Sequence, residues 1–296
     1  MIESVAFDKA ALCSAPSPRS ARAKRLTPAP VFAVTSGKGG VGKTNVVANL
    51  ATALARTNRR VMAIDADLGL ANLDLFLGVK PAYTLADFFS GAAALDEIVV
   101  ANRDGIMLLP GASGVAAITT LNRDQKNSLL TELDVMTEDL DLVLVDTGSG
   151  ISDVVTYFTS AAQEIVVVVT PELASITDAY ALIKVLVSVH GHKRFAILAN
   201  NVADQAQAWR LFDTLSGTAL RFLNASLDFL GWIPRDPQLL RAMAQARTVV
   251  TEAPDAPSSR AFATLAEQFI RIAGRSKVKG NMQFFLRRML AAEIVS

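Results

Sequence analysis

The sequence predicts a three-layer α/β fold, in which helices cover both faces of a twisted, mostly parallel sheet. Short apolar runs typical of buried strands alternate along the chain with segments whose apolar residues recur at helical spacing. Strands separated by helices in this way pair in parallel, through right-handed crossovers. Because 51% of the 296 residues are hydrophobic, the chain can bury the core of one large domain or of two small ones.

The individual elements follow from these patterns. Apolar, often β-branched runs predict strands at residues 31–34, 59–64, 106–109, 142–145, 165–169, 195–199 and 230–234. Apolar residues at intervals of three and four predict helices at residues 45–56, 83–89, 95–100, 121–140, 175–189 and 260–273. Gly91 breaks the chain between the second and third of these helices.

A glycine-rich loop after the first strand carries the strongest functional signal. It matches the phosphate-binding pattern in which two glycines bracket four residues and a Lys-Thr pair follows. The loop consists of Gly37, Lys38, Gly39, Gly40, Val41, Gly42, Lys43 and Thr44. Its backbone N–H groups would converge on a polyphosphate, helped by the dipole of the following helix. Lys43 would reach the outer phosphates, and Thr44 would hold magnesium. A chance match is the alternative, but the flanking strand and helix favour a phosphate site.

Three aspartates follow strands beside this loop. Asp65 and Asp67 come just after the strand at 59–64, and Asp146 closes the strand at 142–145. The ends of parallel strands are where α/β sheets bind ligands. Of the first two acids, one could hold a metal through water and the other could orient an attacking water. Asp146 is the acid that a magnesium–phosphate site requires from its second strand. Capping of the next turn by Asp65 and Asp67 is the alternative.

The composition excludes several classes of protein. A net charge of +1 gives no global attraction to nucleic acid or membrane. A single cysteine, Cys13, excludes a disulfide framework and a cysteine-ligated iron–sulfur cluster within one chain. No apolar run approaches the roughly 20 residues of a membrane span. The N-terminus lacks an apolar secretory core, so we expect a cytosolic protein.

The two ends of the chain differ from the central domain, which we expect at residues 30–273. Residues 1–29 mix Ser, Pro, Ala and basic residues, which predicts a flexible basic tail rather than a docking segment. Residues 274–296 predict a basic linker and an amphipathic helix. The apolar face of that helix consists of Met282, Phe285, Leu286, Met289 and Leu290. Such a helix could lie in a membrane interface or pack on the domain or on a partner, and the pattern leaves both open.

Several motifs resemble one known family. Lys38, early in the phosphate loop, makes it similar to the deviant phosphate loop of the MinD/ParA family of P-loop ATPases, and residues 65–74 resemble the MinD switch segment. Further stretches resemble the flagellar-number regulators called FlhG, FleN or YlxH. These are residues 145–153, 170–172, 177–184 and 280–285. The resemblance extends over residues 31–290.

The resemblance implies a slow ATPase that uses ATP/ADP and Mg²⁺ to switch between monomer and homodimer. Two subunits would face each other across two nucleotides, with Lys38 touching the partner's phosphates. Asp67 would orient the hydrolytic water, so Lys38, Lys43 and Asp67 would be the catalytic residues. Asp146 would support magnesium, and Asp65 would be a second magnesium or switch aspartate.

The resemblance also implies that Asn201 and the backbone around Pro234 hold adenine. Residues 200–204 lack the Asn-Lys-x-Asp pattern that would recognise guanine, which favours ATP over GTP. The implied partners are an FlhF-like GTPase and a flagellar transcription activator, with the protein held peripherally at the inner face of the cell membrane. The N-terminal Asp-Gln-Ala-x-x-Leu-Arg motif that stimulates the GTPase in this family is not matched by residues 8–13.

Two other functions are compatible with the motifs. A ParA-type segregation factor would bind DNA non-specifically as an ATP dimer, but the near-neutral charge and the terminal amphipathic helix argue against DNA. A nucleotide-gated binding module would bind ATP with negligible hydrolysis. Our leading hypothesis is a MinD-like ATPase that regulates flagellar number or placement.

Overall fold

The computed structural model describes residues 29–67, 72–83, 87–88, 90–110, 132, 136–137 and 139–275. The predicted tail up to residue 28 and the predicted terminal amphipathic helix lie outside these ranges, as does most of the predicted helix at 121–140 and part of the one at 83–89. Ala29, which the sequence assigned to the tail, is 3% exposed and packs in the core.

Eight described strands form one sheet, in the order β3-β4-β2-β5-β1-β6-β7-β8. The strands are β1 (Val31–Ser36), β2 (Val61–Ala66), β3 (Val100–Ala101), β4 (Met107–Leu109), β5 (Leu142–Ser149), β6 (Glu164–Val169), β7 (Arg194–Val202) and β8 (Ser226–Pro234). Every pairing is parallel except the short antiparallel one between β3 and β4. The predicted, mostly parallel sheet is confirmed.

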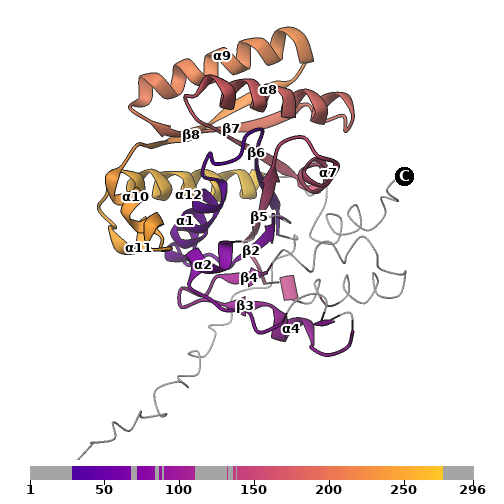
Figure 1. The fold of residues 1–296 in the computed structure, drawn as a ribbon, viewed down its shortest axis with the longest axis vertical. Helices are drawn as coiled ribbons and strands as arrows, with labels where there is room; N and C mark the ends of the chain where they lie inside the picture. The colour runs from indigo at the N-terminus through magenta and orange to yellow at the C-terminus, as the bar shows by residue number, and fades with distance from the viewer. Residues whose placement is uncertain are drawn as a thin grey trace, which may run out of the picture.

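Helices cover both faces of the sheet, as predicted (Figure 1). One face is covered by α1 (Lys43–Arg56), α2 (Leu73–Leu77), α10 (Pro237–Ala244), α11 (Val249–Glu252) and α12 (Pro257–Arg275). The other is covered by α4 (Leu95–Ile98), α7 (Asp153–Ala161), α8 (Leu173–Ser188) and α9 (Gln205–Leu223). Among the described residues, no helix combines the length and apolar character needed to cross a bilayer.

The central strand β1 shows why the apolar runs lack polar alternation. Phe32 and Val34 belong to the core beneath α1 and α12, whereas Val31 and Ala33 belong to the core on the opposite face. All four side chains are 0% exposed. Because successive side chains of a strand point to opposite faces, a strand covered on both sides has to be apolar at every position.

Several strands extend beyond their predicted C-terminal ends, and β2 and β4 begin later than predicted. β5 continues beyond residue 145, so Asp146 lies within the strand and not just after it, and Asp65 likewise lies inside β2. The strand expected from residue 59 begins at Val61, because the backbone N–H of Arg60 donates to the carboxylate of Asp141 at 3.0 Å, outside the ladder. Local apolarity marks the middle of a strand, whereas pairing with neighbours decides its ends.

Other differences lie in the C-terminal half and around β3. The sequence analysis placed no helix where α7, α9 and α10 occur, and β8 begins four residues before the predicted strand at 230–234. α9 carries a clear helical pattern, with Ala208, Leu211, Leu215 and Ala219 buried on one face. Val100, expected at the end of a helix, begins β3, since α4 ends at Ile98.

Candidate functional site

The predicted phosphate loop joins β1 to α1, the arrangement its motif requires. Gly40 and Gly42 have φ values of 76° and 92°, a region that residues with a Cβ rarely adopt. Gly37 packs directly on α8, because a Cβ built there would lie 2.1 Å from the backbone carbonyl of Asp178. The glycines are therefore needed for two different reasons, backbone conformation at Gly40 and Gly42 and close approach at Gly37.

Lys43 is the first residue of α1 and is 8% exposed. Burial lowers the pKa of its ammonium, although the nearby carboxylates of Asp146 and Asp67 act in the opposite direction. A buried cation with carboxylates close by is well placed to bind phosphate oxygens, since the low dielectric strengthens that attraction.

Asp65 and Asp146 are direct neighbours across the parallel pair β2–β5. Burial raises the pKa of Asp146 to about 7; the hydroxyl of Thr44 favours the charged form, the charge of Asp65 opposes it, and Lys43 favours it again. Both carboxylate oxygens of Asp146 are buried without a hydrogen-bond partner of normal geometry. Such an unsatisfied acid beside the Thr44 hydroxyl fits a magnesium site, because the cation would supply the missing interaction.

Asp65 is satisfied differently from Asp146. Its carboxylate accepts hydrogen bonds from the backbone N–H groups of Leu73, at 3.1 Å, and Asp67, at 3.2 Å. Burial raises its pKa to about 6, and these two bonds limit the increase. Asp65 thus joins residues 67 and 73 within the segment that the resemblance identifies as a switch.

Asp67 lies at the carboxyl end of β2, beside Gly148 of β5. A Cβ added to Gly148 would lie 3.7 Å from Asp67 Oδ1. The Asp67 carboxylate therefore lies close to Gly148, at the carboxyl ends of the two paired strands. In the part of the chain that the structure describes, no three acidic, histidine or cysteine side chains form a cluster that could hold a metal.

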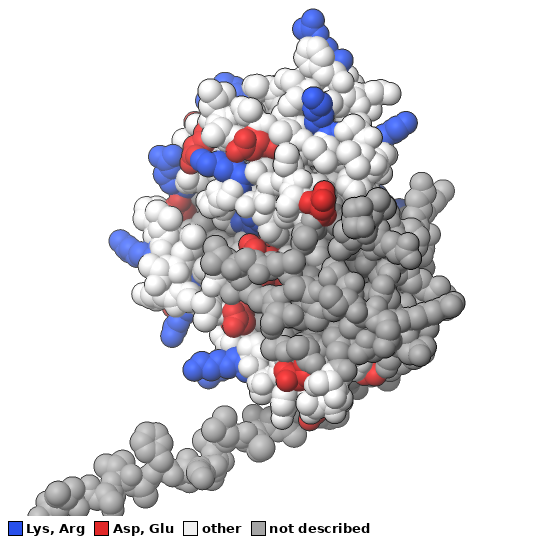
Figure 2. Space-filling view, turned by 45° about the vertical axis from the view of Figure 1, so that its right-hand side comes forward, with Lys and Arg blue, Asp and Glu red and all other residues white. Residues whose placement is uncertain are grey.

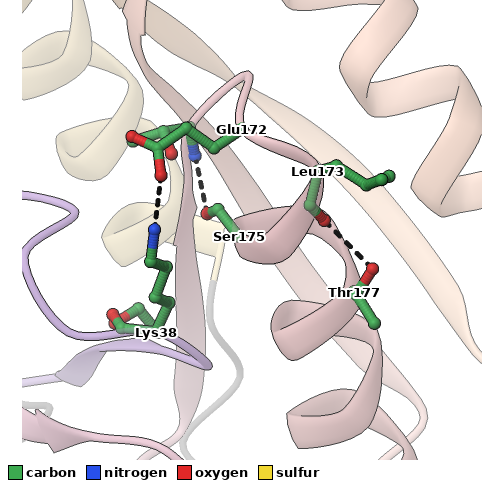
Figure 3. Close-up of polar contacts among 7 residues, drawn as sticks. Lys38, Glu172, Leu173, Ser175 and Thr177 are labelled. Carbon is green, nitrogen blue, oxygen red and sulfur yellow. Dashed lines mark hydrogen bonds and ion pairs between the residues drawn. The ribbon is translucent and has the colours of Figure 1, made fainter.

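Lys38, the second lysine of the loop, lies at the surface and forms an ion pair with Glu172 of the same chain (Figure 3). Glu172 is the residue that precedes α8, and the hydroxyl oxygen of Ser175 stabilises the same turn by accepting a hydrogen bond from Thr170 N at 3.0 Å. The side chains of Lys38 and Glu172 are 36% and 61% exposed. This lysine is therefore accessible from outside, unlike Lys43.

The residues predicted to hold adenine lie at the ends of β7 and β8. Asn201 has a left-handed backbone with φ of 58°, and its side-chain oxygen accepts a hydrogen bond from Arg235 Nε at 3.4 Å. Pro234 ends β8 and lines a cavity of about 470 Å³ between β8 and α12. Val202 of β7 pairs with Pro234 of β8. Asn201 and Pro234, the two residues predicted to hold adenine, therefore lie near each other at the carboxyl ends of neighbouring strands.

Sequence reasoning missed two residues that contact the loop, Asn200 and Glu172. Asn200 Nδ2 donates to the carbonyl oxygen of Val41 at 2.8 Å. A signal existed for Asn200, because side chains along a strand alternate: Leu198 packs on the α1 side of the sheet, and a residue two positions later points the same way. Glu172 had no comparable local signal.

The predicted membrane residues, Met282, Phe285, Leu286, Met289 and Leu290, lie outside the described residues.

The described part of the face in Figure 2 carries Lys and Arg side chains interspersed with Asp and Glu. They do not gather there into one large basic patch. The described part of this face therefore lacks the basic patch that is typical of non-specific DNA binding.

Comparisons with known proteins agree with the geometry of the site. A family model described as "ParA: NUBPL iron-transfer P-loop NTPase" matches residues 28–270. The chain is 41% identical over 265 residues to the antiactivator FleN of Pseudomonas aeruginosa, which covers 90% of this chain and 95% of FleN. It is 33% identical to the flagellum site-determining protein YlxH of Helicobacter pylori, over 88% of this chain and 89% of YlxH. The structure of MinD from Pyrococcus horikoshii in complex with Mg-ADP superposes with a TM-score of 0.64 at 26% identity, covering 84% of this chain and 100% of that chain.

Proposed function

The chain belongs to the MinD/ParA family of P-loop ATPases, in its FleN/YlxH group, and we propose that it is an ATP-driven switch that regulates flagellar number or placement. The observation that carries this proposal is the 41% identity to FleN, because it extends over 95% of that protein. FleN is named an antiactivator and YlxH a site-determining protein of the flagellum. The phosphate loop with its buried acids supports ATP and Mg²⁺ as the ligands.

We assign each residue of the site a separate role in ATP hydrolysis. The loop backbone and Lys43 would bind the phosphates, while Thr44 and Asp146 would hold a magnesium ion, which supplies positive charge against the phosphates. Asp67 is assigned to orienting the attacking water, since it directly follows β2 at the end of the strands where α/β sheets bind ligands. A magnesium ion beside Asp146 would favour its charged form, because nearby positive charge lowers the pKa that burial raises to about 7.

Dimerisation on ATP would involve Lys38. In the described chain this lysine is paired with Glu172, so it has to exchange that partner before it can reach phosphates on a second subunit. The exchange costs little, because exposed ion pairs contribute about 0–1 kcal/mol. The switch would then restrain its partners, an FlhF-like GTPase and a flagellar transcription activator, while the terminal helix holds the dimer at the membrane.

Light scattering on the variant Asp67→Ala with ATP and with ADP tests this switch. Loss of the water-orienting acid should trap the ATP state, giving a dimer with ATP and a monomer with ADP. Asp228→Ala is the control, because it removes an exposed carboxylate on the edge strand β8. A monomer of Asp67→Ala with both nucleotides would overturn the switch, and an ATP-dependent, salt-sensitive DNA shift would favour a segregation factor instead.

A further inference from the structure

Asn200 occupies a position that joins two parts of the nucleotide site. It lies near the end of β7, is 9% exposed, and uses both ends of its side-chain amide. Nδ2 donates to the carbonyl oxygen of Val41 in the phosphate loop at 2.8 Å, and Oδ1 accepts from the backbone N–H of Asn201 at 2.9 Å. One buried side chain therefore bridges backbone segments that are 159 residues apart in the sequence.

The contact with Val41 determines the orientation of a peptide group in the loop. A trans peptide is planar, so the C=O of Val41 and the N–H of Gly42 point in opposite directions. No cis peptide occurs among the described residues. With the carbonyl held toward Asn200, the N–H of Gly42 is directed away from β7. The side chain of Asn200 thus sets the direction of a backbone donor in the loop that binds phosphate.

This peptide needs an external restraint because of the glycines around it. Gly40 and Gly42 have φ values of 76° and 92°, and glycine adopts positive and negative φ about equally readily. The Val41–Gly42 peptide could therefore rotate at small cost if nothing held its carbonyl. The fit is close on the same side, since a Cβ added to Gly42 would lie 2.8 Å from Asn200 Nδ2.

The other end of the amide reaches the turn predicted to hold adenine. Asn200 Oδ1 holds the N–H of Asn201, whose left-handed backbone presents its own side chain to Arg235 at 3.4 Å. The backbone N–H of Arg235 in turn donates to Val202 O at 2.7 Å, tying the end of β8 to β7. Asn200 therefore connects the phosphate loop to the turn at Asn201 that is predicted to hold adenine, here called the base-side turn.

We propose that Asn200 is a positioning residue, which holds the Val41–Gly42 peptide in the orientation that binds phosphate and joins it to the base-side turn at Asn201. This inference rests on the proposed nucleotide function of the site. It assigns Asn200 no contact with the nucleotide itself.

Binding of ADP and of inorganic pyrophosphate, both with Mg²⁺, to the full chain separates this role from others. Asn200→Ala should weaken both ligands by a similar factor of about 10, because it leaves the Val41 carbonyl free to turn. Asn200→Asp should behave in the same way, since it keeps the shape of the side chain but replaces the donor with an acceptor. Asp228→Asn is the control and should leave both affinities within about twofold, because that exposed carboxylate pairs with Arg194 and has no contact with Asn200 or Val41.

Three results would overturn the inference. Weaker ADP binding with unchanged pyrophosphate binding would make Asn200 a base contact. A lower melting temperature of Asn200→Asp with unchanged affinities, measured where the variant is folded, would make its role structural. Tighter or equal pyrophosphate binding by Asn200→Ala would show that the loop needs no restraint. Failure of the unaltered chain to bind either ligand would instead reject the proposed function.

Discussion

The two flanks of the phosphate loop differ in the interactions that stabilise them. On the flank toward β6, β7 and α8, contacts within the chain hold the loop: Asn200 bonds to Val41, Lys38 pairs with Glu172, and Gly37 packs on the backbone of α8. On the flank toward β5 and β2, Asp146 is buried with both oxygens lacking a partner. Folding alone therefore supplies the contacts that hold the loop on the first flank. The second flank retains a buried acid whose charged form a bound cation would stabilise.

Because of this difference, substitutions that change the size of a side chain should affect the first flank most. Substitutions that change its charge should affect the second flank most. Four predictions follow from the contrast, in decreasing order of expected effect.

Gly37→Ala should destabilise the fold most, by at least about 3 kcal/mol, because its Cβ would overlap the backbone of Asp178 and backbone cannot move aside cheaply. Gly39→Ala is the matched control, since its Cβ would lie 3.4 Å from Ser149 Oγ, within reach of a small adjustment. Urea unfolding of the two variants measures the difference in free energy. Equal midpoints for both would contradict the close packing of the loop on α8.

Asp146→Asn should stabilise the ligand-free protein, and more so at pH 7.5 than at pH 4.5. The folded pKa of about 7 lies above the ordinary value of 3.8, so the folded state binds the proton more tightly than the unfolded state does. Stability from this group is therefore full below about pH 4 and is lost as the pH rises through about 7. Asn removes that loss, which is on the order of a few kcal/mol.

Chemical denaturation at the two pH values, with a chelator present, measures this effect. Asp228→Asn serves as control, because that carboxylate is exposed and paired with Arg194. A stability gain of Asp146→Asn that is the same at both pH values would show that the burial of charge is not its cause.

The same Asp146→Asn substitution should weaken the binding of Mg-ADP by roughly 10- to 100-fold, as is common when a group supporting a metal is lost. ADP binding in the absence of magnesium should change little. Titration calorimetry with and without Mg²⁺ gives both values. Equal weakening under the two conditions would assign Asp146 to the loop itself and not to the metal.

Glu172→Gln should have the smallest effect, changing the free energy of unfolding by less than about 1 kcal/mol, because both partners of the ion pair are partly exposed. Asp228→Asn, which breaks the exposed pair with Arg194, should give a change of similar size. Added salt should reduce both differences. A loss above about 2 kcal/mol for Glu172→Gln alone would mean that this pair supports the loop and does more than hold Lys38.

Much of the site was predictable from short stretches of chain. The loop at residues 37–44 and the acids at 65, 67 and 146 stand in local motifs, and the apolar runs predicted each long strand of the sheet. The helical period of α9 is equally local, so the sequence also contains the signal for this helix. Element ends were less predictable, because β5 continues through Asp146 only by pairing with both β1 and β2.

By itself the sequence determined the α/β class, the phosphate loop and the family, because all three depend on residues close together in the chain. Only the tertiary structure decided that Asp146 lies opposite Asp65, that Asn200 holds Val41, and that Lys38 is paired with Glu172. The last two contacts join residues 159 and 134 positions apart. They depend on the order β2-β5-β1-β6-β7, which no local period specifies, because strands of one apolar pattern can pair in many orders.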